Sequence, residues 1–347
     1  MSYTITAKMI NVEDFSEQDV NQWAQDVGLL KVVRPNAVNP QYLLLLKSNE
    51  VIILDRYGNK RLEMTLDYTA IHCAINNNGE FAISSDYDVY LYNSDGSLRT
   101  ILSFGNKVQE IYLGTDYLTV LLQTSPAQLY IYKLSDLSYS NFSFSVNSAG
   151  ACHHTIDEDG DHVWIIRTSG GNCYIALIKQ LSQQFDKNTG KSSDWVDAIR
   201  CRPDGIIAVG ESHDSGRIDI IAVRNDGVLA NILSYSVSSP YATNISFDIN
   251  ATKIMVIKKG SATLRKLSLN VDIMSLSEVT NITLTENAEA GGLDVGGCND
   301  ATPDGKYHLI QLQTKCVIVD YDDMSIKKEI TKSTVDVPLR MLAVEVT

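Results

Sequence analysis

A turn followed by an apolar strand recurs seven times along the chain of 347 residues. Asn78-Gly79 precedes Phe81–Ser84, for example, and Pro203-Asp204-Gly205 precedes Ile206–Val209. Asn or Asp side chains hydrogen-bond to nearby backbone, and a following Gly adopts the positive φ that tight hairpins need. The residues that mark these turns are at positions 40, 79, 115, 160, 205, 251 and 305. In six of the seven turns, the residue immediately before the marked position is Asn or Asp.

Each repeat contains further strands around this one. In the second repeat, Asp88–Tyr92 leads through the turn Asn93-Ser94-Asp95-Gly96 into Leu98–Leu102. Another strand precedes the turn that marks each repeat, as Val108–Leu113 and Trp195–Cys201 illustrate. A unit of four short strands joined by hairpins, about 40 residues long, is typical of one blade of a β-propeller.

The polarity of the strands agrees with this architecture. Stacking neighbouring blades around an axis buries both faces of the middle strands and leaves only short edges. Tyr42–Leu46 and Val163–Ile166 are accordingly continuous apolar runs, whereas Tyr139–Phe144 and Ile326–Ile330 are more polar and suit outer positions. The sequence predicts an all-β fold, a seven-bladed β-propeller of four-stranded antiparallel blades.

The Pro-Asp-Gly turns at 203–205 and 303–305 resemble those of seven-bladed propellers related to the WD-repeat and bacterial surface-repeat families. The resemblance covers roughly residues 29–333. No Gly-His or Trp-Asp pair closes any unit, so the resemblance indicates the superfamily and no specific subfamily. It implies a fold and carries no particular activity with it.

The predicted organisation has three parts. An N-terminal strand and helix occupy residues 1–28, the propeller occupies residues 29–333, and a closing strand occupies residues 334–347. Either Leu339–Val346 or Tyr3–Ile10 would complete a blade with strands from the other end of the chain, and the pattern leaves both open. The predicted blades cover residues 29–67, 68–105, 106–147, 148–191, 192–236, 237–286 and 287–333.

The N-terminal segment has the spacing of a short amphipathic helix. Val20, Trp23 and Val27 fall at helical intervals, and Gly28 follows them as a stop. Such a helix would plug or cap one face of the propeller. Alternatively it would dock a protein partner, in which case the partner-binding residues are Phe15, Val20, Trp23 and Val27.

Composition narrows the classes of function. The chain has 42 acidic against 29 basic residues, a net charge of −13, which argues against binding to nucleic acid. No apolar run is long enough to span a bilayer, and no signal peptide is recognisable, so we expect a cytoplasmic protein or one within an assembled particle. The six cysteines show no Cys-x-x-Cys spacing, which suggests buried thiols in a reducing compartment.

Two groups of residues are candidate metal ligands. Asp157, Asp159 and Asp161 alternate around a turn and could supply carboxylate oxygens to Ca²⁺, although the same turn recurs without acids elsewhere. Cys152 and His154 lie on one face of a predicted first strand, where soft and imidazole ligands would suit zinc. Ordinary turn chemistry and packed side chains are the alternatives, and the fold itself requires no cofactor.

Three readings of function follow. The first is a non-catalytic scaffold for protein–protein interaction within a multi-protein complex or a virus particle, with no catalytic residue and an open oligomeric state. The second is a metal-dependent hydrolase or lactonase that uses Glu110, Asp197 and Asp294 on first strands, although the sequence offers no paired base or nucleophile. The third is a surface- or glycan-binding adhesin, for which the 17 tyrosines are suited.

Overall fold

The computed structural model divides the chain into two compact units, Met1–Pro40 and Gln41–Thr347. All of the residues that the structure describes belong to the second unit. They are 41–47, 49–55, 60–76, 78–146, 152–156, 160, 162–169, 172–188, 195–201, 207–212, 217–223, 229–236, 243–247, 252–258, 260–270, 275–287, 300–301, 306–331 and 340–345. The predicted N-terminal helix, with Phe15, Val20, Trp23 and Val27, lies outside the described residues.

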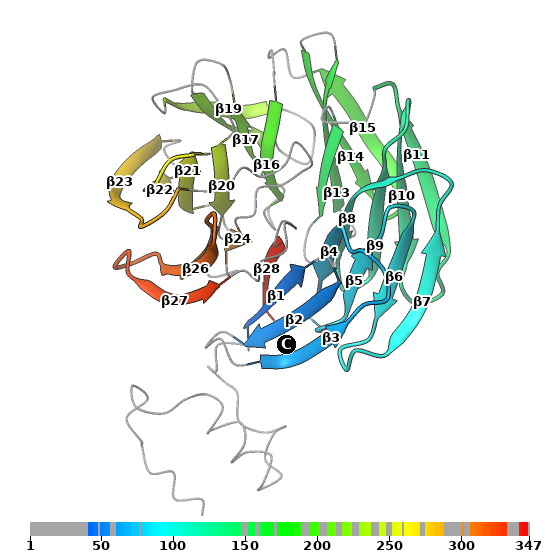
Figure 1. Cartoon of the computed structure of the whole chain (residues 1–347). Helices are drawn as coiled ribbons and strands as arrows, with labels where there is room; N and C mark the ends of the chain where they lie inside the picture. The colour runs from blue at the N-terminus through cyan, green and yellow to red at the C-terminus, as the bar shows by residue number, and fades with distance from the viewer. Residues whose placement is uncertain are drawn as a thin grey trace, which may run out of the picture. The chain divides into compact units, whose positions relative to one another are not determined.

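The described residues form small antiparallel sheets, which we name A to H (Figure 1). Sheet A contains Arg340–Glu345 (β28), Gln41–Lys47 (β1), Glu50–Asp55 (β2) and Lys60–Thr65 (β3), in that order. Sheet B contains His72–Ile75 (β4), Phe81–Ser84 (β5), Asp88–Tyr92 (β6) and Leu98–Ser103 (β7). Sheet C contains Val108–Leu113 (β8), Tyr117–Leu122 (β9), Ala127–Lys133 (β10) and Tyr139–Phe144 (β11). Sheet D contains Cys152–Ile156 (β12), His162–Ser169 (β13), Asn172–Lys179 (β14) and Ser182–Asn188 (β15).

The remaining sheets follow in chain order. Sheet E pairs Trp195–Cys201 (β16) with Ile207–Ser212 (β17), and sheet F pairs Arg217–Val223 (β18) with Leu229–Ser236 (β19). Sheet G contains Thr243–Phe247 (β20), Lys253–Lys258 (β21), Thr263–Asn270 (β22) and Ser275–Thr283 (β23). Sheet H contains Asp300–Ala301 (β24), Tyr307–Gln311 (β25), Lys315–Asp320 (β26) and Ile326–Thr331 (β27).

The fold is an all-β propeller of small antiparallel sheets, but the predicted seven four-stranded blades are not what the structure has. Six sheets have four strands, and sheets E and F have two each. The prediction fails at the segment 192–236, because the hydrogen-bonded ladder is interrupted between β17 and β18. The four residues that connect these strands, 213–216, lie outside the described residues.

The C-terminal strand completes the first sheet. Strand β28 pairs antiparallel with β1, from Gln41 opposite Glu345 to Leu46 opposite Arg340, and Figure 1 draws the two strands in red and blue. Of the two alternatives from the sequence, the strand near Leu339–Val346 therefore occupies this edge. The other alternative, Tyr3–Ile10, lies outside the described residues.

Neighbouring sheets pack through the apolar faces of their middle strands. Val51 and Ile53 of sheet A pack with Phe81 and Ile83 of sheet B in one continuous cluster. Similar clusters join sheets B and C, sheets C and D, and sheets G and H. All four residues of β5 are buried, as the continuous apolar run predicts, whereas β7 and β23 are largely exposed. Strand β5 thus contributes to two interfaces, because Phe81 and Ile83 belong to the cluster shared with sheet A and Ala82 to the one shared with sheet C, as expected for stacked blades.

The outer hairpins of sheets B, C and H share an Asp-x-Ser turn. In each, the Asp carboxylate accepts hydrogen bonds from the N–H and the hydroxyl of the Ser two residues later, at 2.8–2.9 Å and 2.6 Å. The middle residue has a positive φ of 84° at Gly96, 58° at Leu137 and 58° at Met324. The Asp therefore supplies the local bonds that hold even Leu and Met in a left-handed conformation.

Candidate functional site

A buried carboxylate lies on the first strand of sheet C. Glu110 belongs to β8, next to an irregularity in the pairing of β8 with β9 between Val108 and Glu110. Its side chain is buried, and its Oε2 accepts hydrogen bonds from the backbone N–H of His154 at 3.0 Å and from the ring Nδ1 at 2.9 Å. Two bonds from one residue of the neighbouring sheet thus fix the position of the carboxylate.

The imidazole of His154 is held at both ring nitrogens. Nδ1 faces Glu110, and Nε2 lies 2.8 Å from the hydroxyl of Thr119 on β9. The ring of Tyr112 meets the imidazole edge-on at a centroid distance of 4.9 Å, and its hydroxyl lies 3.4 Å from Glu110 Oε1. We call Glu110, Tyr112, Thr119 and His154 the inner polar cluster. The inner polar cluster links β8, the first strand of sheet C, to β12, the first strand of sheet D. Its carboxylate and its imidazole are buried and face each other.

Cys152 is buried two residues before His154 on β12. Burial, reinforced by the charge of Glu110 and opposed by Arg167, raises the pKa of the Cys152 thiol to about 12. Coordination to zinc would itself lower the pKa of this thiol, so a zinc site at Cys152 and His154 stays a prediction. No group of three His, Cys, Asp or Glu side chains that could hold a metal occurs within the described ranges.

The other predicted acids have no side chain among those that the structure describes. Asp157, Asp159 and Asp161 lie outside the described residues, so a calcium site there stays a prediction. Asp294 also lies outside them, and for Asp197 the structure describes only the backbone of β16. Of the acids that the hydrolase alternative invokes, only Glu110 has a described side chain, and its partners come from sheets C and D.

A second buried histidine was missed from the sequence. His308 on β25 faces Ser246 on β20, with Nδ1 2.6 Å from the hydroxyl oxygen, and its ring stacks on Tyr321 at 5.5 Å. Both members of the pair are buried, so the Ser hydroxyl is not placed to attack a substrate from solvent. The available signal was a polar residue inside the apolar run Tyr307–Ile310. As in the inner polar cluster, the imidazole and the hydroxyl come from neighbouring sheets.

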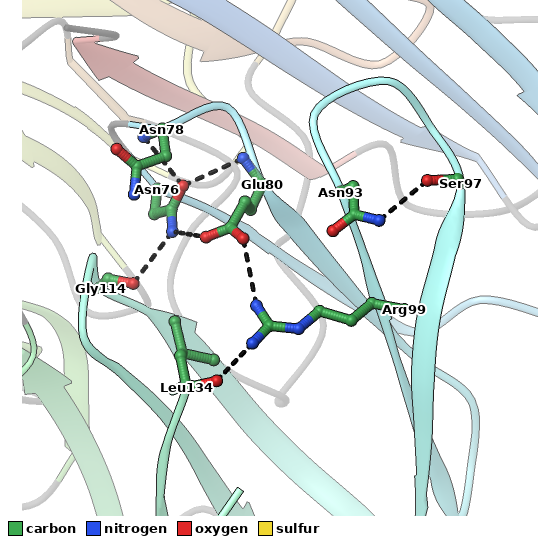
Figure 2. A network of polar contacts seen from close by, with 8 residues as sticks. All are labelled: Asn76, Asn78, Glu80, Asn93, Ser97, Arg99, Gly114 and Leu134. Atoms are coloured by element: carbon green, nitrogen blue, oxygen red, sulfur yellow. Dashed lines mark hydrogen bonds and ion pairs between the residues drawn. The ribbon is translucent and has the colours of Figure 1, made fainter. Parts of the chain in front are cut away.

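A polar network near the surface also ties sheet B to sheet C, and Figure 2 shows its members converging from both. The Asn76 amide donates to Glu80 at 2.9 Å and to the carbonyl oxygen of Gly114 at 3.1 Å. Arg99 donates to Glu80 at 3.1 Å and also to the carbonyl oxygen of Leu134. Each charged group is matched inside the network, which indicates a structural link between the sheets.

Aromatic side chains gather at the outer part of the interface between sheets B and C. Tyr130 and Tyr132 on β10 both contact Phe104 and Tyr139, with ring centroids 5.1–6.3 Å apart. Tyr139 is 58% exposed, whereas Tyr132 is 8% exposed. The cluster mainly fills an interface, so the adhesin alternative stays a prediction supported by one accessible ring.

Comparison with known proteins gives a fold and no family. No protein-family model matches the chain, and no curated protein matches it. Among solved structures, a functionally unknown protein from Desulfotomaculum acetoxidans is 12% identical and aligns with a TM-score of 0.70 over 88% of this chain and 99% of that one. The Cps50 (Swd1) β-propeller domain from Myceliophteria thermophila is 12% identical, with a TM-score of 0.57 over 76% of this chain and 88% of that one.

A third similar structure is that of KlAtg21 in complex with the coiled coil of AgAtg16. It is 14% identical, with a TM-score of 0.62 over 85% of this chain and 97% of that one. The chain has a WD40-like β-propeller fold. At such identities the likeness concerns the fold alone, because unrelated functions occur on the same propeller. No helix in the described part of this propeller is long and apolar enough to cross a membrane.

Proposed function

We propose that the protein is a non-catalytic β-propeller scaffold that binds other proteins, as a structural component of a larger assembly such as a multi-protein complex or a virus particle. A propeller offers a rigid frame on which loops and strand edges present binding surfaces. The partners are proteins; the acidic charge of −13 disfavours nucleic acid.

This proposal rests on one observation: the acid and the imidazole of the inner polar cluster make their hydrogen bonds within the cluster. General acid or base catalysis needs a carboxyl or imidazole group within reach of a substrate proton. In this protein Glu110 accepts two bonds from His154, and the remaining ring nitrogen of His154 faces Thr119. Their full burial favours a structural role that holds sheet C against sheet D.

The KlAtg21 structure gives further support, because that propeller is seen with a coiled coil of another protein. For this chain we propose the predicted amphipathic helix as one docking element, with Phe15, Val20, Trp23 and Val27 as its contact residues. A chain without residues 1–28 should then keep the unfolding midpoint of the full chain and lose its partner. Loss of folding would instead assign the segment a structural role.

Native mass spectrometry of the protein purified from its source tests the proposed function. We expect the chain to be found with one or more other proteins at fixed stoichiometry. The chain alone, carrying one divalent ion for each copy, would contradict the scaffold and favour the hydrolase alternative. A variant with Trp23→Ala should lose the partner, whereas the exposed substitution Tyr87→Ala, on a loop of sheet B, serves as a matched control.

A further inference from the structure

Among the strands that the structure describes, the outer strand of each four-stranded sheet has one edge without a strand partner. Strands β3, β7, β11, β15, β23 and β27 are terminal in the order of their sheets. An unpaired edge presents backbone N–H and C=O groups that can pair with a strand of another molecule. Natural proteins oppose such pairing with charged residues or proline on the edge strand.

Strand β11 differs from the other five in having no such protection. Each of the others carries at least one charged residue, namely Lys60 in β3, Arg99 in β7, Asp186 in β15, Glu278 in β23 and Lys327 in β27. Strand β11 reads Tyr-Ser-Asn-Phe-Ser-Phe and contains neither a charge nor a proline. Its aromatic residues also have a high preference for β structure.

The side chains of β11 are accessible and partly ordered in advance. Tyr139, Asn141 and Ser143 are exposed, and they alternate along one face of the strand. The ring of Tyr139 rests against Tyr132 at 5.1 Å and Tyr130 at 5.8 Å. Because its own sheet already restricts this ring, association would cost less side-chain conformational entropy.

We propose that two copies of this chain associate by pairing their β11 strands antiparallel across a two-fold axis. Antiparallel neighbours that lie directly opposite share one face of the sheet, so the axis passes through a residue position. Centred on Asn141, the pairing sets Asn141 opposite itself, Tyr139 opposite Ser143, and Ser140 opposite Phe142. The same patch serves on both copies, as a closed two-fold interface requires.

Charge explains why a second copy would choose this edge. Two copies that each carry a net charge of −13 repel each other, and directly opposed like charges on paired strands are destabilising. Pairing β27 with itself about Lys328 would set two Lys328 side chains opposite each other, whereas β11 pairs without opposing any charges. The acidic net charge and the small contact along one strand predict a weak dimer, in the class of interfaces below about 1,200 Å².

Sedimentation velocity of the full chain over a range of concentrations tests this proposal. We expect the average mass to rise above 38.4 kDa as concentration increases. Asn141→Lys places two lysines opposite each other at the axis and should raise the dimer dissociation constant about tenfold or more, a change of ~1.4 kcal/mol. Ser143→Lys should act in the same direction and is a second, independent variant.

Asn281→Lys is the matched control, because Asn281 is also an exposed asparagine on an outermost strand, β23. It should leave the dissociation constant unchanged, and the unfolding midpoints of all variants should equal that of the natural chain. A chain that stays monomeric at millimolar concentration would overturn the proposal. Equal effects of Asn141→Lys and Asn281→Lys on the dissociation constant would also overturn it. Strand β19 is likewise uncharged, so a dimer that is disrupted only by Asn231→Lys on β19 would contradict pairing through β11.

Discussion

The contacts of His154 define its hydrogen-bonding state. With Nδ1 donating to the Glu110 carboxylate, the neutral imidazole keeps an acceptor at Nε2, which the Thr119 hydroxyl can satisfy as a donor. The hydroxyl of Thr119 can also accept from an Nε2–H group, since an O–H group both donates and accepts. The cluster therefore provides partners for either protonation state of the ring.

Removing the imidazole should destabilise the protein strongly. In His154→Ala the Glu110 carboxylate loses its ring partner while it stays buried, and leaving a buried charged group without a partner costs more than the ~1–3 kcal/mol of an unsatisfied neutral group. Urea unfolding followed by tryptophan fluorescence measures the loss. Thr119→Val, which removes only one hydroxyl, should cost less, about 1–3 kcal/mol. Equal costs for the two variants would argue against the hydrogen bond between Glu110 and the His154 ring as the main contribution.

The thiol of Cys152 should make stability fall at alkaline pH. Its pKa rises from 9.0 in the unfolded chain to about 12 in the folded protein. Between these values the unfolded state releases a proton that the folded state keeps, so stability decreases as pH rises from 9 towards 12. Urea midpoints measured at several pH values should decline less steeply in Cys152→Ala. An unchanged slope would show that other groups, such as Tyr132, dominate the alkaline loss.

Among the elements, the Asp-x-Ser hairpins should contribute a dependence on acid pH. Hydrogen bonds from Ser97 lower the pKa of Asp95, and those from Ser138 lower the pKa of Asp136. Lys327 and Ser325 lower the pKa of Asp323 in the same way. Their stabilising contribution is present above the ordinary carboxyl pKa of 3.8 and is lost as the pH falls below it.

Thermal unfolding between about pH 5 and pH 2 tests this contribution. Replacing all three residues, as Asp95→Asn, Asp136→Asn and Asp323→Asn, keeps an oxygen acceptor and removes the titration. The triple variant should therefore show a shallower fall of its melting temperature than the natural chain. Asp67→Asn, an exposed aspartate outside these hairpins, is the control and should leave the slope unchanged.

The turn between β12 and β13 requires glycine for two reasons. Gly160 has a φ of +82°, and a Cβ atom there would lie 3.1 Å from both the Cβ and the carbonyl oxygen of Tyr117. Gly260 has a φ of +69° but open space around it, so Gly260→Ala should cost only the left-handed strain of about 1–2 kcal/mol. Gly160→Ala should cost more in chemical denaturation, and equal losses would show that the contact with Tyr117 relaxes freely.

The sequence predicted local features far better than contacts between sheets. The bounds expected for β8 and β16 coincide with the structure, because strand and turn signals are local. It also indicated that Glu110 and Cys152–His154 lie on first strands. It did not predict that Glu110 would face His154, since that pairing depends on how two sheets align after a separation of 44 residues.

At the scale of the whole molecule, pairing of β28 with β1 predicts that the C-terminal strand is essential for folding. A chain that ends at Pro338 would leave β1 without its neighbour and expose a sheet edge. We expect it to aggregate or to lose a cooperative thermal transition. A synthetic peptide of residues 339–347 should restore the transition, whereas a scrambled peptide should not. An unaltered melting temperature in the truncated chain would contradict this role.

The same pairing sets an order of events during biosynthesis. Strand β1 leaves the ribosome about 300 residues before β28, and synthesis proceeds at about 5–20 residues per second. The first sheet therefore waits at least about 15 seconds for its last strand while every later sheet can already assemble. During that interval the nascent chain bears an open leucine-rich strand, and this is the period in which a molecular chaperone would have the greatest effect on yield.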